Sequence, residues 1–234
     1  MTKQARVLLM MPNIKGMKSG VNRIQPGLGI GYLGSVLRKS GHEVYIRDCA
    51  LEGYCNKKNL DNKIVLIGES NENIASYIAS LNPDIIGISV LFSNMMDHAH
   101  NIAKIAKTVN PLIKVILGGN HISNAVRDYQ FALKHPDAWV PEKIVDMQDK
   151  NIDFAMRGEV EYQFADLVKK LINEQDPKDI PGLIYFKNNR IYINPAPSPL
   201  KDINKLPFPS RDLMNLEGYF KIGLFHSCKS KSRR

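Results

Sequence analysis

The sequence has few cysteines and no long hydrophobic run. Its three cysteines, Cys49, Cys55 and Cys228, lack the paired spacing of a zinc site, so neither a disulfide framework nor a metal centre is indicated. The longest apolar stretch, 85–92, is far shorter than the roughly 20 residues that cross a bilayer. The apolar run 7–11 is too short for the core of a signal peptide. We therefore expect reduced thiols, no membrane segment and a cytoplasmic location.

Excess positive charge is also scarce outside the C-terminal end. The formal net charge is +9, and four positive residues (Lys229, Lys231, Arg233 and Arg234) lie among the last six, so +9 minus four leaves +5 for the rest. Elsewhere lysine and arginine are scattered among acids and form no stripe with aromatic residues. This pattern predicts a solvated basic end and no nucleic-acid partner.

Several catalytic motifs of α/β proteins are missing. No Gly-Lys-Ser/Thr exists to cradle a phosphate, and "GISVL" at 87–91 lacks the second glycine of a serine-hydrolase elbow. A phosphorylated receiver domain needs acids after its first strand, where Met10, Met11 and Pro12 stand instead. These three classes are excluded.

Apolar runs alternate with helical patterns along most of the chain. This alternation predicts a doubly wound α/β fold with a five-stranded parallel sheet covered by helices. We expect strands at 7–11, 41–48, 84–91, 113–119 and 152–158, and helices at 29–39, 71–81, 95–109, 122–133 and 161–172.

The pattern changes at residue 181. Two β-rich runs around Asn188 and Asn189 predict a β-hairpin, and a proline-rich segment follows. We expect an α/β ligand-binding domain at 1–175, a hairpin appendage at 176–200 and an extended linker at 201–234.

A Gly-x-Gly-x-x-Gly run at Gly29, Gly31 and Gly34, followed by Asp48, has the spacing of a dinucleotide-binding fingerprint. The fingerprint works only where its glycines form the turn between a strand and a helix. Here the preceding strand is expected to end near Met11, and Gly29 lies inside the helix. We interpret the glycines as sites of close helix packing.

Ligands of open parallel sheets bind at the carboxyl ends of the strands. Three loops are expected to meet there, at 12–27, 91–94 and 118–123. Ser89 and Leu91 share one side of their strand, and Gly118 and Gly119 remove side chains from the adjacent strand. Together they predict a slot for a bulky flat group, although a glycine pair at a strand end is also typical of a plain turn.

Ser89-x-Leu91 followed by Gly118-Gly119 resembles a cobalamin-binding signature. The segments "PGLGIGYLGSVLRKSGHEV", "PDIIGISVL", "VILGGNHIS", "DFAMRGEVEYQF", "IPGLIY" and "INKLPFPSRDL" resemble, in this order, the N-terminal half of cobalamin-dependent radical S-adenosylmethionine enzymes. The resemblance implies a flavodoxin-like, Rossmann-like cobalamin-binding domain at 1–175. It also implies that the serine and the glycine pair flank the nucleotide tail of the cofactor.

The resemblance extends to further candidate cofactor-binding residues. The loop at 12–27 would cover one corrin face, yet it has no histidine to bind cobalt, and its polar candidates are Asn13, Asn22, Arg23 and Gln25. His121 either contacts the tail or faces solvent. The candidate set is completed by Pro26, Gly27, Leu28, Gly29, Val90, Asn94, Asn120, Arg157, Gly158 and Glu159.

The chain lacks the Cys-x3-Cys-x2-Cys motif that holds the 4Fe-4S cluster of radical enzymes. The resemblance therefore implies a module that binds cobalamin and does not catalyse alone. A radical S-adenosylmethionine domain, in cis or in trans, would supply the cluster and complete a methyltransferase. Two alternatives stay open, namely a cofactor-free interaction module and a flavin- or nicotinamide-binding oxidoreductase domain.

Overall fold

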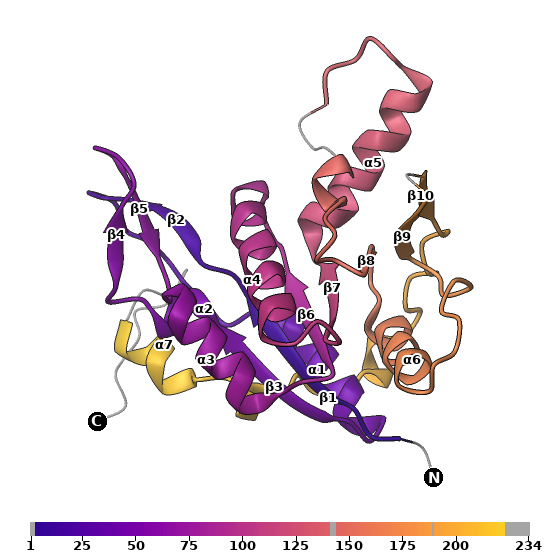
Figure 1. The fold of residues 1–234 in the computed structure, drawn as a ribbon, viewed down its shortest axis with the longest axis horizontal. Helices are drawn as coiled ribbons and strands as arrows, with labels where there is room; N and C mark the ends of the chain where they lie inside the picture. Colours follow the sequence, from indigo (N-terminus) through magenta and orange to yellow (C-terminus); the bar gives the residue numbers. More distant parts are fainter. Residues whose placement is uncertain (1–2, 141–143, 189, 223–234) are drawn as a thin grey trace.

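The computed structural model describes residues 3–140, 144–188 and 190–222 (Figure 1). Its centre is a seven-stranded sheet in the order β10-β9-β8-β7-β6-β1-β3. The five strands from β8 to β3 are parallel, which confirms the predicted doubly wound sheet. The strands are β1 (Arg6–Met11), β3 (Glu43–Asp48), β6 (Ile85–Ser89), β7 (Lys114–Gly118), β8 (Phe154–Met156), β9 (Leu183–Lys187) and β10 (Arg190–Ile193).

Helices cover both faces of this sheet. Successive residues of β1 point to opposite faces because side chains alternate along a strand. Leu8 and Met10 pack in one core with α3 and α4, whereas Val7 and Leu9 pack in a second core with α1 and α6. The helices are α1 (Leu28–Lys39), α3 (Asn71–Leu81), α4 (Met96–Val109), α5 (Asn120–Lys134) and α6 (Glu161–Ile172).

The predicted β-hairpin is present as β9 and β10, although Asn189 at its tip lies outside the described residues. Strand β9 pairs antiparallel with β8, where Ile184 lies opposite Ala155. The hairpin thus continues the large sheet. The division of the chain at residues 175 and 200 stays a prediction.

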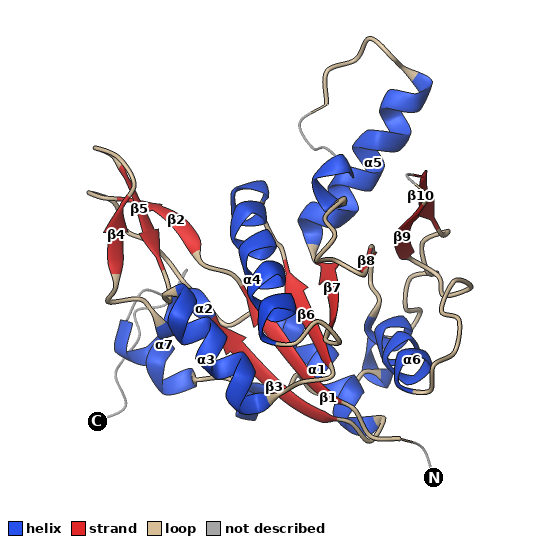
Figure 2. Ribbon diagram, viewed as in Figure 1, coloured by secondary structure: helices blue, strands red, loops and turns tan. Residues whose placement is uncertain are grey.

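A second sheet, which the sequence analysis missed, lies beyond the carboxyl end of β3 (Figure 2). It consists of the antiparallel strands β2 (Ile14–Met17), β5 (Ile64–Ile67) and β4 (Lys57–Asn59). These strands are short, β4 is exposed throughout, and the apolar run of β5 is only four residues long. The loop expected at 12–27 therefore contains a strand, and α2 (Cys49–Glu52) follows β3 directly.

The segment after residue 200 packs against the domain. The backbone N–H of Ser210 donates to the carbonyl oxygen of Gly31 in α1 at 3.0 Å. The segment ends in α7 (Leu216–Ile222), where Tyr219 is 2% exposed. The expected linker is thus folded back at 201–222, while Cys228 and the basic end lie outside the described residues. None of the helices in the described part of the chain is long and apolar enough to span a membrane.

Candidate functional site

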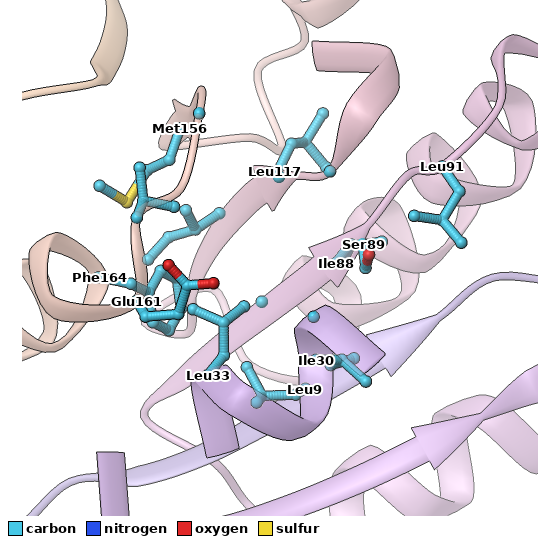
Figure 3. Close-up of a pocket in the computed structure, with 17 residues that line it drawn as sticks. Leu9, Ile30, Leu33, Ile88, Ser89, Leu91, Leu117, Met156, Glu161 and Phe164 are labelled. Atoms are coloured by element: carbon cyan, nitrogen blue, oxygen red, sulfur yellow. The ribbon is translucent and has the colours of Figure 1, made fainter. Parts of the chain in front are cut away.

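The strand order reverses at β1, which lies between β3 and β6, and two clefts open at this carboxyl edge. The inner cleft lies between α1, α6 and the ends of β6 and β7, and its cavity volume is about 140 Å³ (Figure 3). Its lining is mostly apolar, as is usual for ligand pockets. The lining residues are Leu9, Gly29, Ile30, Leu33, Gly87, Ile88, Ser89, Leu91, Ile116, Leu117, Gly118, Gly119, Met156, Gly158, Val160, Glu161 and Phe164.

The glycine pair after β7 has two separate roles. A Cβ atom on Gly118 would meet no heavy atom within 4 Å, so this position leaves open space in the inner cleft. Gly119 has a φ of +100°, and its Cβ would lie 2.5 Å from the carbonyl oxygen of Val90. That carbonyl accepts the N–H of His121 at 3.1 Å. Gly118 therefore shapes the cleft, and Gly119 permits the close approach of two backbones.

Glu161 is the charged side chain that lines the inner cleft. It is the first residue of α6, and its Oε2 atom is buried without a hydrogen-bond partner in the described part of the chain. Burial raises the pKa of its carboxyl group. Its neighbours in the lining include Leu33 and Phe164. A polar group in an otherwise apolar wall can orient a ligand.

The outer cleft adjoins the inner one at Leu91, which lines both. It lies between the loop that follows β1 and the loop that follows β6, with a cavity volume of about 390 Å³. No histidine occurs among the residues that line it. These residues are Met11, Pro12, Ile14, Lys15, Arg23, Ile24, Gln25, Asp48, Ala50, Leu91, Phe92, Asn94 and Met95.

Asp48 links the outer cleft to the C-terminal segment. Its Oδ1 atom accepts the backbone N–H groups of Ala50 and Leu51 at 3.0 and 3.2 Å, and so caps α2. Its Oδ2 atom accepts the hydroxyl of Tyr219 at 2.6 Å. Burial raises the pKa of Asp48 to about 6, despite these hydrogen bonds. The acid of the apparent dinucleotide fingerprint thus holds the helix start and α7.

The two clefts contain many of the residues expected from the sequence. Gly29, Ser89, Leu91, Gly118, Gly119 and Gly158 line the inner cleft, and Arg23, Gln25, Leu91 and Asn94 line the outer one. Ser89 and Gly118 are register partners on neighbouring strands. The slot predicted from these residues therefore corresponds to a real cleft in the structure.

Asn13 and Asn22 make structural hydrogen bonds instead of lining a cleft. The Asn13 amide donates to the carbonyl oxygen of Glu69 at 2.9 Å and accepts its backbone N–H at 3.0 Å. Asn22 bonds in the same way to the backbone of Met17, at 2.9 and 2.8 Å. The loop after β1 is thus fixed to the segment after β5.

The remaining polar candidates lie around the clefts. His121 is 2% exposed, which contradicts the solvent-facing alternative, while Asn120 and Glu159 are exposed. Arg157 donates to the side chain of Gln130 at 3.4 Å and to the carbonyl oxygen of Asn194 at 3.2 Å. None of these four candidates lines either cleft.

The remaining loop candidates differ in their exposure, and the glycines of α1 differ in what they pack against. Val90 is fully buried, Leu28 is 55% exposed, and Pro26 precedes Gly27, the N-cap of α1. A Cβ on Gly34 would lie 3.3 Å from Ile46 of β3, as expected for close packing on the sheet. On Gly31, however, it would lie 2.8 Å from Met214 and 3.0 Å from Pro209. Gly31 therefore makes room for the C-terminal segment, which corrects the expectation that it faces the sheet.

Sequence analysis missed most of the apolar lining and Glu161. The helical pattern of α6 carried a usable signal, because residues three apart share one face of a helix. Glu161 and the buried Phe164 have this spacing. The contribution of Leu33 could not be found in this way, because it depends on how α1 packs beside α6.

Comparison with known proteins identifies the family. A model of the B12 binding domain matches residues 15–168. The chain belongs to the B12 binding domain family. The match includes Ser89, the glycine pair and Glu161, and it covers the residues that line the two clefts except Leu9, Met11, Pro12 and Ile14. The glycine fingerprint of a dinucleotide-binding protein does not apply, because β1 ends at Met11 and α1 begins only at Leu28.

Relatives of this B12 binding domain are methyltransferases. It is 27% identical over 95% of its length to cytidylyl-2-hydroxyethylphosphonate methyltransferase of Streptomyces wedmorensis, and 30% identical over 95% to an uncharacterized methyltransferase of Pyrococcus horikoshii. The chain spans 43% and 41% of these two proteins.

Solved structures with this fold include cobalamin-dependent radical S-adenosylmethionine enzymes. OxsB with aqua-cobalamin and S-adenosylmethionine bound has a TM-score of 0.63 at 19% identity, covering 94% of this chain and 26% of that one. The radical methyltransferase TsrM of Kitasatospora setae has a TM-score of 0.55 at 18% identity, covering 82% and 30%. At these identities the likeness concerns the fold.

Proposed function

We propose that this chain binds cobalamin, with the nucleotide tail in the inner cleft and one corrin face against the outer cleft. The observation that carries the proposal is the open space at Gly118. A flat ligand group can enter there because no side chain of Gly118 fills the space over the ends of β6 and β7. Gly29 on the opposite wall is equally open, since its Cβ would meet no heavy atom within 4 Å.

Each cleft suits a different part of the cofactor. The inner cleft is mostly apolar and takes a planar base between α1 and β7, with Ser89 as a hydroxyl at its edge. The outer cleft carries the polar side chains of Lys15, Arg23, Gln25 and Asn94, which match the amide groups around a corrin. Its walls offer no imidazole to cobalt.

We further propose that the chain is the cofactor-binding part of a radical S-adenosylmethionine methyltransferase. Cobalamin, when bound, supplies a cobalt centre that can carry a methyl group. The residues of this chain hold and orient the cofactor and exclude water from its tail. A catalytic domain with a 4Fe-4S cluster and S-adenosylmethionine, in the same polypeptide or a separate one, would perform the radical chemistry. The cytoplasmic location and the absence of a nucleic-acid partner stay predictions.

Gel filtration after mixing with hydroxocobalamin tests the binding. The protein peak is expected to carry the visible absorption of the corrinoid, and a colourless peak would overturn the proposal. Parallel mixtures with FAD and NAD test the oxidoreductase alternative, because their absorption spectra differ from that of a corrinoid. The link to radical chemistry is tested by the coding sequence that follows, where a Cys-x3-Cys-x2-Cys motif is expected.

A further inference from the structure

Glu161 places a carboxyl group inside the inner cleft, and within the described part of the chain this group is only partly satisfied, by the N–H of its own backbone. Its Oε2 atom is buried and has no hydrogen-bond partner there. Figure 3 shows the carboxyl oxygens close to the side chains of Leu33 and Phe164, towards the middle of the lining residues. Burial also raises the pKa of this group. Such a buried, unsatisfied oxygen requires an explanation.

The position at the start of α6 does not explain it. An acid in the first turn of a helix is favourable because it faces the positive end of the helix dipole. Glu159, two residues earlier, is exposed and can supply negative charge near the helix start without desolvation. Glu161 instead loses hydration on one oxygen, which is costly unless a ligand returns the hydrogen bond. The geometry therefore favours a ligand-facing role.

We propose that Glu161 accepts a hydrogen bond from the nucleotide tail of the bound corrinoid, which makes it a determinant of tail specificity. This inference rests on the proposed binding of cobalamin. The donor is an N–H or O–H group of the tail, and two sources exist. One is a ribose hydroxyl, which all nucleotide tails share. The other is the amino group of an adenine base, which a dimethylbenzimidazole base lacks because its outer edge carries methyl groups.

Three corrinoids distinguish these sources. Hydroxocobalamin carries dimethylbenzimidazole, pseudocobalamin carries adenine, and cobinamide has no nucleotide tail. Equilibrium dialysis of each against the wild type and Glu161→Leu gives the dissociation constants. Glu161→Gln retains an acceptor oxygen, and Asp166→Leu is the matched control, since Asp166 is an exposed acid on the same helix. Glu161→Ala repeats the comparison if the leucine variant does not fold.

The expected result is a loss of about tenfold or more in affinity for a tailed corrinoid on Glu161→Leu, the size typical of a lost hydrogen bond to a charged group. A loss for pseudocobalamin alone assigns the donor to the base, and equal losses for both tailed corrinoids assign it to the ribose. Cobinamide binding, Asp166→Leu and Glu161→Gln are expected to stay within about threefold of the wild type.

Two results overturn the inference. One is unchanged or tighter binding of all three corrinoids by a folded Glu161→Leu variant, as expected if the carboxyl group only opposes an apolar ligand. The other is an equal loss for cobinamide, because the donor would then belong to the corrin ring. If the wild type binds none of the three, the proposed cobalamin binding itself has failed, and this outcome differs from both.

Discussion

Replacement of Gly118 by valine is predicted to change the shape of the inner cleft without changing the stability of the fold. Gly118 ends β7 opposite Ser89 in β6, and a Cβ there would meet no heavy atom within 4 Å. Its φ is not positive, so a branched side chain meets no backbone strain. Valine is also well suited to a strand. Gly118→Val should therefore fold normally while its methyl groups enter the cleft.

Gly118→Val is expected to weaken the binding of the ligand. Extra methyl groups in a well-packed site typically cost about 1–3 kcal/mol, because the partner must shift or be excluded. With about 1.4 kcal/mol for each tenfold change, hydroxocobalamin should bind roughly 5- to 140-fold more weakly. The free energy of unfolding of the ligand-free protein should change by less than about 0.5 kcal/mol, as for a surface substitution.

Equilibrium dialysis with hydroxocobalamin measures the first quantity, and urea unfolding without ligand measures the second. Gly119→Val is the matched control. With a φ of +100° and a Cβ 2.5 Å from the carbonyl oxygen of Val90, this variant should lose stability as well as binding. The reasoning is refuted if folded Gly118→Val binds hydroxocobalamin as tightly as the wild type, or if both valine variants unfold equally easily.

Three further predictions concern the surrounding structure. The folded-state pKa of Asp48, about 6, lies above the ordinary value of 3.8, so the unfolding free energy should fall by up to roughly 3 kcal/mol as pH rises from about 4 to about 6. Asp48→Asn should abolish this fall in urea titrations, and an unchanged slope would contradict the assignment. Asn13→Ala leaves the carbonyl oxygen of Glu69 without its side-chain donor, and it removes one of the two acceptors of the Glu69 N–H, the other being the carbonyl oxygen of Cys49. It should lower the unfolding free energy by about 1–3 kcal/mol, and a stability equal to the wild type in urea would show that the pair contributes nothing. Gly31→Ala should expose residues 201–222 to trypsin, because its Cβ would lie 3.0 Å from the ring of Pro209, whereas Gly29→Ala has open space and should not. Equal digestion of the two variants would argue against this packing.

The large sheet was predictable because its strands have a simple composition. Strands covered on both faces are apolar throughout, as in the buried runs of β1, β6 and β7. In the second sheet only the short strand β5, Ile64–Ile67, gives such a signal. β4 is Lys-Lys-Asn, and it becomes a strand only because β5 lies beside it. Its pairing is a tertiary effect.

The candidate site was predictable to a similar extent. Ser89, Gly118 and Gly119 follow from strand-end position and residue size, and the structure brings them together in one cleft. Asn13 was a candidate because it is polar, but its side-chain amide is hydrogen-bonded to the backbone of Glu69. A polar residue in a loop can serve a ligand or the backbone, and the sequence does not distinguish these uses.

The sequence by itself determined the alternation of strands and helices in the large parallel sheet and the carboxyl edge at which the clefts open, because these follow from periodicity and chain topology. It also determined that the glycines at 29–34 lie inside a helix, too far from β1 for a dinucleotide turn. Only the tertiary structure decided that Glu161 faces the inner cleft, that Asp48 holds Tyr219, and that Gly31 accommodates the C-terminal segment. Each of these three depends on which distant element packs beside the residue, and local sequence does not record that contact.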